Sequence, residues 1–389
     1  MEWIWALLTG VLLAIYVVLM LVYRYFFMRL PVFVPSHHPA DASLFFTVII
    51  PARNEAKHIE RCVTAVFQQL QSTISFEVIV VDDYSEDATA DIVRGLKGRY
   101  AALKLLQLQD FPDAMAGQAF KKKAIEFAIQ QSKGNWIVTT DADCEVPPNW
   151  LALLHAYIVQ NNPVMVAAPV MFFPGKGVLS IFQALDFLSL QGITAASVSA
   201  GLHSMCNGAN LAYRKDVFEA VGGFSAHTHL ATGDDMLLMH AVNKQYPNRV
   251  GYLFSRDALV LTEPAESWHS FLHQRIRWAS KADSYGEPKI FGVLLIVWLL
   301  NALLTLGLLL VLLQQLSWVS WLVLLLIKTI AELCFLMPVA RFFQAEALLA
   351  YFPFMQPLHI VYTTLAGWLG KWGSYQWKSR TIHTRSTLD

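Results

Sequence analysis

Hydrophobic and polar positions follow two different patterns along the chain. Between residues 45 and 265, short apolar runs alternate with segments in which apolar residues recur every three or four positions. The short runs are typical of buried strands, and the longer spacing is typical of amphipathic helices. Their strict alternation predicts βαβ units and a mostly parallel sheet. Ligands bind such sheets outside the carboxyl ends of the strands, so the residues after each strand are the first candidates for a functional site. The predicted strands are 45–51, 76–83, 103–108, 135–143 and 163–173, and the predicted helices are 57–70, 87–98, 121–132 and 148–160.

Three long apolar segments predict membrane-spanning helices. Trp3–Val22 and Ile290–Leu313 carry no charged residue, and about 20 apolar residues are enough for a helix to cross a bilayer. Trp318–Val339 carries Lys328 and Glu332. These two lie four residues apart, hence on one helix face, and we expect them to pair.

A fourth apolar segment, 348–369, is interrupted by Pro353 and Pro357, and can either span the bilayer or enter it and return. Arg24 and Arg29 follow the first span, and basic residues there indicate the cytoplasmic side. The basic tail of the chain also favours the cytoplasm. That preference conflicts with four complete spans from an outside N-terminus, so the number of spans stays open.

The composition agrees with a membrane protein. Hydrophobic residues make up 55% of the 389 residues and the mean hydropathy is +0.42, whereas roughly 45–50% is usual for soluble proteins. The 29 basic and 29 acidic residues balance, which argues against a nucleic-acid-binding protein. The four cysteines form no CxxC pattern, so neither a zinc site nor a disulfide framework is predicted.

Acidic side chains follow two predicted strands, and a further acidic pair begins a later helix. The pair Asp82–Asp83 ends the second strand, Asp141 and Asp143 end the fourth, and Asp234–Asp235 begins the helix. One such acid alone is often a helix cap. Several acids on one rim would repel one another unless a cation lay among them. The cluster therefore predicts Mg²⁺ or Mn²⁺, which take carboxylate oxygens together with phosphate oxygens.

Signatures of other nucleotide-binding or hydrolytic proteins are absent from the sequence. It contains no P-loop, no GxGxxG after the first strand, no HExxH and no GxSxG. The ligand that fits the acidic residues is a nucleotide whose diphosphate is bound through a metal ion.

Five segments, in this order, resemble the family 2 inverting glycosyltransferases. They are VIIPARNE, VVDDYSED, TTDADCEVPPNW, TGDDMLL and QRIRW. The subgroup that they resemble is membrane-integral, with a GT-A type catalytic domain followed by C-terminal spans, as in ceramide and hopanoid glucosyltransferases and polysaccharide synthases. The resemblance covers nearly the whole middle domain and is weakest over the C-terminal membrane part.

The resemblance implies an α/β, Rossmann-like GT-A domain with transmembrane helices on both sides. We expect an integral protein of the bacterial inner membrane whose catalytic domain lies in the cytoplasm. The expected parts are an anchor helix at 1–27, the GT-A domain at 45–265, an amphipathic interface helix at 266–285, membrane helices at 290–370 and a basic tail at 371–389.

The resemblance also assigns residues to the donor side of the site. Glu55 and Asp83 fall near the ribose and base. Lys121 matches a lysine of the family, although Lys122 and Lys123 leave its register open. The residues implied to bind the nucleotide sugar are Pro51, Arg53, Glu55, Asp82, Asp83, Lys121, Asp141, Gln274, Arg277 and Trp278.

The same resemblance implies where the metal, the base and the acceptor lie. Asp141 and Asp143 form a D-x-D motif, with Asp143 as the direct metal ligand. Asp235 is the general base, and Asp234 stands where many relatives have glutamate. The residues implied on the acceptor side are Asn207 and Asn210.

Helical periodicity predicts two faces for residues 268–281. The apolar stripe is expected at the membrane interface, with Arg275 near it reaching lipid phosphates. Arg277 is expected to meet the leaving diphosphate. The apolar stripe comprises Trp268, Phe271, Leu272, Ile276 and Ala279, and the opposite side carries Gln274, Arg277 and Trp278.

We therefore expect transfer of a sugar from a nucleotide-diphospho-sugar, a UDP-sugar first of all, to a hydroxyl of a lipid or lipid-linked acceptor. Asp235 would take the hydroxyl proton during attack on the anomeric carbon, with inversion. One alternative is a processive polysaccharide synthase, against which the few C-terminal spans argue. The other is a membrane protein that only binds nucleotide sugars, against which the full set of acids argues.

Overall fold

The computed structural model describes residues 2–36, 44–70, 74–111, 120–224, 234–281, 287–372, 374–377 and 380–383. They form two compact units. The sheet unit comprises Pro31–Phe173 and Ser204–Glu263, and the helical unit comprises Met1–Leu30, Pro174–His203 and Pro264–Asp389.

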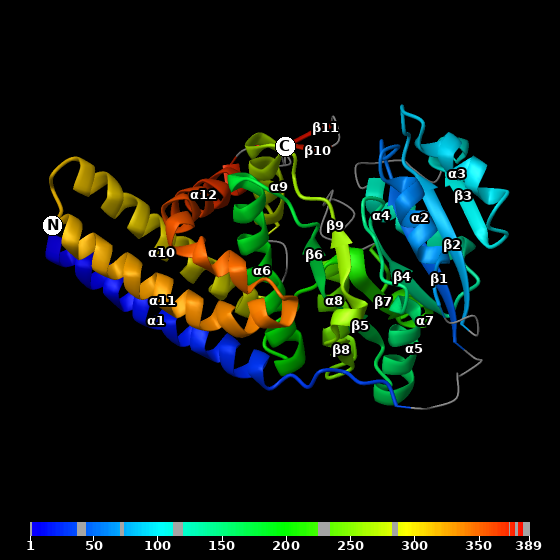
Figure 1. Cartoon of the computed structure of the whole chain (residues 1–389), viewed down its shortest axis with the longest axis horizontal. Coiled ribbons are helices and arrows are strands. Elements are labelled where there is room, and N and C mark those ends of the chain that lie inside the picture. Colours follow the sequence, from blue (N-terminus) through cyan, green and yellow to red (C-terminus); the bar gives the residue numbers. More distant parts are fainter. Residues whose placement is uncertain are drawn as a thin grey trace. The chain divides into compact units, whose positions relative to one another are not determined.

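A seven-stranded sheet forms the core of the sheet unit (Figure 1). Its strands are β1 (Phe45–Ala52), β2 (Ser75–Asp82), β3 (Leu103–Gln107), β4 (Trp136–Thr139), β5 (Met165–Ala167), β7 (Leu211–Arg214) and β8 (Val250–Tyr252). Their order is β3-β2-β1-β4-β7-β5-β8, and only β7 runs antiparallel to its neighbours. The predicted α/β class with a mostly parallel sheet is confirmed.

Helices cover this sheet because its central strands are apolar on both sides. Val48, Ile49 and Ile50 of β1 are fully buried, as expected for parallel strands with helices on both faces. In the first covering helix, Ile59, Val63 and Val66 recur at helical spacing and are fully buried as well. The helices of this unit are α2 (Ile59–Phe67), α3 (Thr89–Lys97), α4 (Phe120–Gln131), α5 (Trp150–Asn161), α7 (Lys215–Ala220) and α8 (Asp234–Gln245), with short 3₁₀ turns η1 (Leu108–Asp110), η3 (Gly208–Asn210) and η5 (Arg256–Ala258).

The single strand predicted at 163–173 is wrong, because the chain changes sheets within it. After β5, the segment β6 (Val170–Phe172) pairs in parallel with β9 (Val260–Thr262) in a separate two-stranded sheet. Pro169 lies at the break and has no N–H for a ladder. The strand predicted at 135–143 is also shorter, since β4 ends at Thr139, before the two acids.

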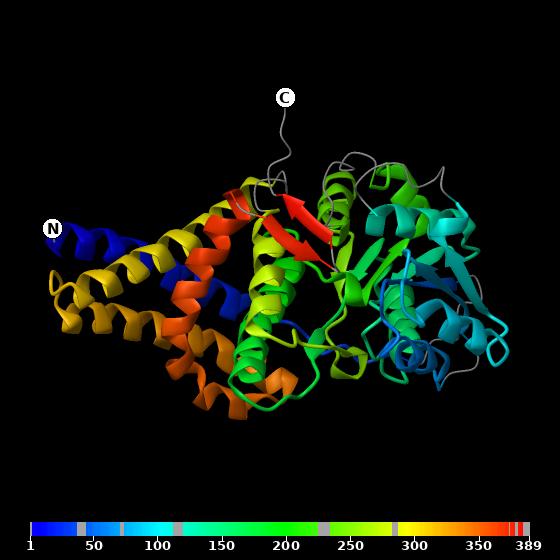
Figure 2. The ribbon, with the colours of Figure 1, turned by 90° about the horizontal axis from the view of Figure 1, so that it is seen from above.

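Long helices make up most of the helical unit (Figure 2). Helix α1 contacts α6, α10 and α11, and α12 contacts α9 and α10. The helices are α1 (Glu2–Met28), α6 (Val178–Ala200), α9 (Trp268–Ala279), α10 (Pro288–Leu312), α11 (Trp318–Phe343) and α12 (Phe352–Trp372), with the 3₁₀ turn η7 (Glu346–Ala350) and the hairpin β10 (Ser374–Trp377) and β11 (Arg380–His383).

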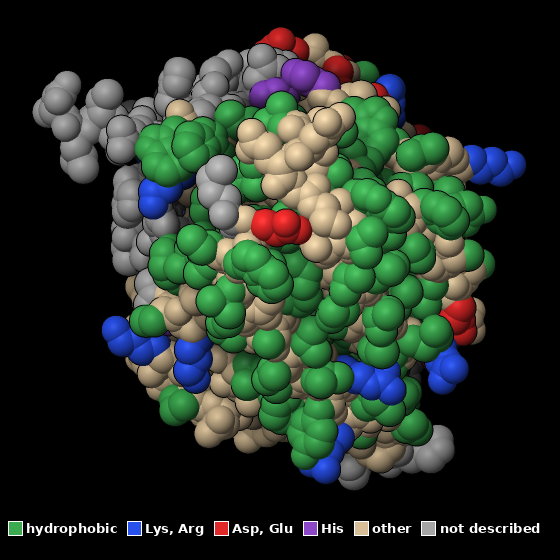
Figure 3. Space-filling view, turned by 90° about the vertical axis from the view of Figure 1, so that its left-hand side faces the viewer, with side chains coloured by type: hydrophobic (Ala, Val, Ile, Leu, Met, Phe, Trp, Pro, Cys, Tyr) green, Lys and Arg blue, Asp and Glu red, His purple; other side chains and the backbone are tan. Residues whose placement is uncertain are grey.

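Within the described part of the chain, α1, α6, α10 and α11 are long and apolar enough to cross a membrane. Hydrophobic side chains cover most of the face that Figure 3 shows. Helix α6 was not predicted as a span, because Gln183, Asp186 and Gln191 interrupt its apolar run. Those three side chains are buried within the protein.

The domain boundaries predicted at 45 and 265 differ from those of the structure. Residues 174–203 belong to the helical unit, because α6 packs against α1 and α11. The helical unit therefore receives chain from three separate stretches of the sequence.

A buried polar cluster joins three helices of this unit. The predicted pair is present, with the Lys328 Nζ atom 2.6 Å from the Glu332 Oε1 atom. The Tyr16 hydroxyl of α1 donates to Glu332 at 2.6 Å. The Gln356 amide of α12 contacts both charged groups, at 2.9 and 2.7 Å. Each group thus finds its partners inside the protein.

Candidate active site

Two loops at the carboxyl ends of β1 and β2 are tied to each other by hydrogen bonds. The backbone N–H of Asn54 donates to the Ser85 hydroxyl at 3.0 Å, and the N–H of Glu86 donates to the Asn54 side chain at 2.8 Å. Arg53 donates to the carbonyl oxygens of Asp83 and Tyr84, at 2.7 and 3.1 Å. These contacts give Arg53 a structural role in the loops, and its predicted contact with a nucleotide stays a prediction.

Asp82 is a buried acid whose environment does not fully compensate its charge. Its side chain is 2% exposed, and its Oδ1 atom has no hydrogen-bond partner among the described residues. Burial raises its pKa, against hydrogen bonds from Ser85 that lower it. A buried polar atom without a partner costs stability. Acids perturbed in this way cluster at functional sites.

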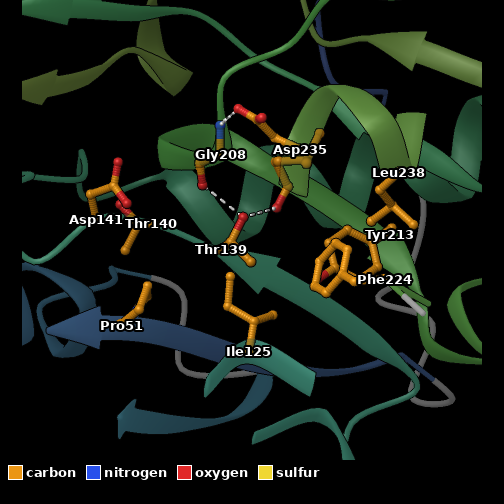
Figure 4. Close-up of a pocket in the computed structure, with 11 residues that line it drawn as sticks. Pro51, Ile125, Thr139, Thr140, Asp141, Gly208, Tyr213, Phe224, Asp235 and Leu238 are labelled. Carbon is orange, nitrogen blue, oxygen red and sulfur yellow. Dashed lines mark hydrogen bonds between the residues drawn. The ribbon is translucent and has the colours of Figure 1, made fainter. Parts of the chain in front are cut away.

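A pocket lies at the carboxyl ends of β1 and β4, beside the start of α8 (Figure 4). Three of the predicted site residues line it, one from each of these elements or the loop that follows it: Pro51, Asp141 and Asp235. The structure therefore brings together the end of the first strand, the D-x-D segment and the expected base. The remaining lining residues are Ile125, Thr139, Thr140, Gly208, Leu211, Tyr213, Phe224 and Leu238.

Backbone N–H groups fix the carboxylate of Asp235 at this pocket. Its Oδ2 atom accepts from the N–H of Gly208 at 3.0 Å, and its Oδ1 atom accepts from the N–H of Met236 at 2.8 Å. The Thr139 hydroxyl donates to the Gly208 carbonyl oxygen at 2.7 Å, which fixes that turn to the end of β4 (Figure 4). A carboxylate held in this way has a defined orientation and can take up a proton from a molecule in the pocket.

The D-x-D residues are half-buried at the end of β4. The Oδ1 atom of Asp143 lies 3.3 Å from the Thr262 hydroxyl. Arg61 of α2 donates to the Asp143 carbonyl oxygen at 3.2 Å, and to the Glu263 carboxylate at 2.7 Å. The contact of Arg61 with the Asp143 carbonyl oxygen fixes the backbone of the motif.

The donor set fits a hard divalent cation that also binds a substrate. No group of three His, Cys, Asp or Glu side chains able to hold a metal occurs in the described ranges. Asp141 and Asp143 can supply one or two carboxylate oxygens. Mg²⁺ and similar ions are commonly held by one or two carboxylates together with substrate phosphates and waters.

Asn210 does not face an acceptor, so this prediction is corrected. Its side chain is fully buried. It accepts from the Trp150 indole N–H at 2.9 Å, and donates to the carbonyl oxygens of Pro169 and Ala258 at 2.8 Å each. Asn207 is half-buried, and its side chain accepts from the N–H of Ala209 at 3.0 Å, which caps η3.

Two predicted residues have side chains outside the described part of the structure. Lys121 lies in the first turn of α4, and Asp234 is the first residue of α8. Of the neighbouring lysines, Lys122 is 1% exposed. Glu55 is half-buried and Asp83 is buried, each in the loop that follows its strand.

Helix α9 carries the predicted Gln274, Arg277 and Trp278 as half-buried side chains. It belongs to the helical unit, whereas the acids belong to the sheet unit. The predicted lipid-facing stripe is wrong for Phe271 and Ile276, which are buried in the protein. Phe271 is 1% exposed and packs against Phe182 of α6 and Tyr362 of α12. Ile276, 3% exposed, packs against Ala366 of α12.

Arg275 does not reach lipid phosphates either. Its side chain is 5% exposed, and its guanidinium lies 2.6 Å from the carboxylate of Asp186 on α6. Phe271, Ile276 and this arginine are therefore parts of the protein interior, whereas Trp268 is 43% exposed.

Sequence reasoning missed several residues that line the pocket. Gly208 lies between Asn207 and Asn210, which the resemblance had assigned to the acceptor side, and Thr139 and Thr140 directly precede the D-x-D motif. These three had a local signal in the sequence. Phe224 and Leu238 had none, because only the tertiary fold brings them to the pocket.

Open α/β sheets bind ligands outside the carboxyl ends of their strands, where the pocket of this chain lies. The model of the glycosyl transferase family group 2 matches residues 136–367, and the model of glycosyl transferase family 2 matches residues 47–222. The first match covers more than half of the chain. The chain therefore belongs to glycosyl transferase family group 2, and it is a glycosyltransferase.

Characterised relatives agree with this membership. Glycosyltransferase AglE of Haloferax volcanii is 28% identical over 233 residues, which are 60% of this chain and 71% of that protein. The probable glycosyltransferase YdaM of Bacillus subtilis is 26% identical over 238 residues. That alignment covers 60% of this chain but only 54% of YdaM.

The fold is also similar to that of a solved structure. This is mannosyltransferase PcManGT from Pyrobaculum calidifontis, in complex with GDP-Man and Mn²⁺. The two chains are 19% identical, the match covers 94% of this chain and 99% of the other, and the TM-score is 0.58. At this identity the likeness shows a shared fold.

Proposed function

We propose that this glycosyltransferase moves a sugar from a nucleotide-diphospho-sugar to a hydroxyl of a lipid or lipid-linked acceptor, with inversion at the anomeric carbon. The observation that supports it most is the pocket at the carboxyl ends of β1 and β4, where Asp141 and Asp235 both lie. UDP-sugars are the first candidates as donors. GDP-sugars come next, since PcManGT was solved with GDP-Man.

Asp235 acts as the general base. The acceptor oxygen forms a bond to the anomeric carbon as its proton passes to the Asp235 carboxylate. The bond from that carbon to the diphosphate breaks on the opposite face, and the nucleoside diphosphate leaves with the electron pair. The backbone N–H groups of Gly208 and Met236 hold the carboxylate in place for this step. A positioned base contributes roughly 10²–10⁴-fold to a rate.

Asp141 and Asp143 hold a divalent cation, Mg²⁺ or Mn²⁺, together with the donor diphosphate. When bound, such an ion offsets the negative charge that develops on the leaving group. Gln274, Arg277 and Trp278 contact the nucleotide sugar, with Arg277 adding a fixed positive charge at the diphosphate. Glu55, Asp82 and Asp83 contact the nucleoside.

Four apolar helices support a membrane location and an acceptor that enters from the bilayer. We place the sheet unit on the cytoplasmic side of a bacterial inner membrane, where nucleotide sugars are available. Arg24, near the end of α1, and Arg29, directly after it, support this orientation.

The test is incubation of the purified chain with a panel of UDP- and GDP-sugars and a membrane lipid extract, with products identified by mass. One sugar added to a lipid, with release of the nucleoside diphosphate, is the expected result. A ladder of products would instead indicate a processive polysaccharide synthase. If no donor in the panel released its nucleotide in the presence of acceptor, the proposal would be overturned.

A further inference from the structure

One buried arginine on α9 is held in place by two other helices of the helical unit. The Nε and Nη2 atoms of Arg275 lie 2.8 and 2.6 Å from the Oδ2 atom of Asp186 on α6. The Tyr362 hydroxyl of α12 donates to the other oxygen of the same carboxylate. Arg275 and Asp186 are only 5% and 6% exposed. Both oxygens of Asp186 are thus used, and the guanidinium plane is fixed on one side.

The edge of the guanidinium away from Asp186 contacts Gln274, and one of its faces lies over Trp278. Both residues belong to the Q-x-x-R-W motif. The Nη1 atom of Arg275 donates to the Oε1 atom of Gln274 at 2.5 Å. The guanidinium carbon lies 4.2 Å from the centre of the Trp278 ring and 4.5 Å from that of Phe271. The rings therefore fix the tilt of the guanidinium as well as its direction.

The contact with Gln274 also sets which groups this glutamine presents. Arginine donates hydrogen bonds and accepts none. The amide of Gln274 must therefore turn its oxygen toward Arg275, which directs its NH₂ group elsewhere. An NH₂ group is a donor, as an anionic diphosphate or a sugar hydroxyl requires.

We propose that Arg275 is a positioning residue for Gln274 and Trp278, and that Asp186 in turn holds Arg275. The inference rests on the proposed contact of those two motif residues with the nucleotide sugar. Side chains ordered before the donor arrives cost no further ordering on binding, which favours affinity. Only arginine offers a planar fork that can bond a carboxylate, donate to an amide and stack on an indole at once.

The alternative is that the Arg275–Asp186 pair has only a structural role and stabilises the packing of α9 against α6. The two readings differ in what Arg275→Lys does. Lysine keeps the positive charge for Asp186 but loses the stacked plane and the bond to Gln274. Positioning predicts a KM for the nucleotide sugar raised about tenfold, the worth of one charge-assisted hydrogen bond together with a cation–π contact, while kcat falls less. A purely structural role predicts a lower melting temperature and an unchanged KM for the nucleotide sugar.

The experiment measures KM, kcat and melting temperature for Arg275→Lys, Gln274→Ala and the double variant, in the full chain in detergent. Arg214→Lys is the matched control, because Arg214 pairs with Asp216 on the surface of the sheet unit. We expect the two single effects on KM to be far from additive, since residues in contact share their interaction energy. Additive effects, or an unchanged KM for Arg275→Lys in a folded variant, would overturn the inference.

Two further results keep the outcomes distinct. If Gln274→Ala leaves the KM unchanged, it is the proposed role of the motif that fails. If Gln274→Ala raises the KM while Arg275→Lys does not, the inference fails alone. Should Arg275→Lys not fold, Asp186→Asn replaces it, because asparagine keeps an oxygen for Arg275 at lower charge. It should raise the KM about threefold in the same direction, and a normal KM there would contradict the inference.

Discussion

The two units of this chain treat charged side chains in opposite ways. In the helical unit, Lys328 lies against Glu332, and Arg275 against Asp186, with every one of these groups buried. At the rim of the sheet unit, Asp141 and Asp235 line a pocket, and the described contacts of Asp235 are with backbone N–H groups. The charges named in the helical unit form buried pairs, whereas the two acids of the sheet unit lie at one pocket.

This difference separates charges that build the protein from charges that meet a ligand. A buried pair with both partners present needs nothing from outside, and removing one partner leaves an uncompensated charge. A rim of acids lowers its repulsion only when a cation or a cationic group joins it. The following variants and treatments test this distinction, beginning with the effect that we expect to be largest.

Removing the metal should have the largest effect on the rate of sugar transfer, because it acts on the acids of the sheet unit. We expect EDTA, or Asp143→Ala, to lower transfer by roughly 10³-fold or more, because a bound ion commonly supplies several kcal/mol to the transition state. Asp91→Ala is the control, since Asp91 is an exposed acid of α3 that pairs with Arg94. Full turnover in a metal-free assay would remove the D-x-D motif from the mechanism.

Breaking the buried pair of the helical unit should cost stability. Glu332→Gln leaves Lys328 buried beside a neutral partner, and we expect a loss of about 3–5 kcal/mol in the free energy of unfolding. The double variant Lys328→Met with Glu332→Leu removes both charges and should be much less harmful. Thermal unfolding in detergent measures both. A double variant as unstable as the single one would mean that packing, and not charge, dominates this cluster.

Asn210 should behave as a core residue, although it lies close to the site in sequence. Asn210→Ala leaves the Trp150 indole N–H without its partner and removes one donor from each of two carbonyl oxygens, so we expect a loss of about 1–3 kcal/mol. The transfer rate of the remaining folded protein should be unchanged. Asn207→Ala, which removes only a half-buried cap, should cost less. If Asn210→Ala changed the KM for the acceptor, Asn210 would have to be assigned to the acceptor side of the site after all.

The smallest expected effect is a gain in stability. The pKa of Asp82 is raised in the folded protein, so its ionisation disfavours folding as the pH rises above the unfolded value of about 3.9. Asp82→Asn should therefore raise the melting temperature at neutral pH, and the gain should vanish in acid. Donor affinity should fall. A lower melting temperature at neutral pH would show that the charge of Asp82 is compensated.

Glu77 is the matched comparison within the same strand, β2. Burial alone would raise its pKa, but hydrogen bonds from Lys104, from the N–H of Lys133 and from Thr47 lower it overall. Its stabilising contribution is then present above the unfolded pKa and lost as the pH falls through the lower folded value. Glu77→Gln should lower the melting temperature at neutral pH, opposite in sign to Asp82→Asn.

Local sequence patterns predicted most of the sheet unit, because its strands and the acids that follow them are visible within short stretches of the sequence. An apolar run such as Val78–Val81 is visible in the sequence, and the acids directly follow the strand that presents them. The parallel arrangement then brings Asp141 and Pro51 to one pocket without further information. Gly208 could be suspected only from its neighbours Asn207 and Asn210, since its contact with Asp235 spans 27 residues.

The helical unit was predicted less well, for a physical reason. A helix that is apolar on one side looks the same whether lipid or protein covers it, so Phe271 was assigned to the membrane interface. The partner of Arg275 lies 89 residues earlier, on α6, and that helix was itself missed because its buried polar residues resemble those of a soluble helix. Pairing across helices is long-range, and periodicity does not report it.

The most direct test of the proposed function is a paired measurement on Asp235→Asn. The variant keeps the shape of the side chain and removes its charge. The account predicts that nucleotide release with acceptor falls by roughly 10²–10⁴-fold, while affinity for the nucleotide sugar and the metal stays close to normal. Asp234→Asn, measured beside it, should lose less, since asparagine caps a helix about as well as aspartate. Turnover by Asp235→Asn at the wild-type rate, or an inactive Asp234→Asn beside an active Asp235→Asn, would contradict the assignment of Asp235 as the base.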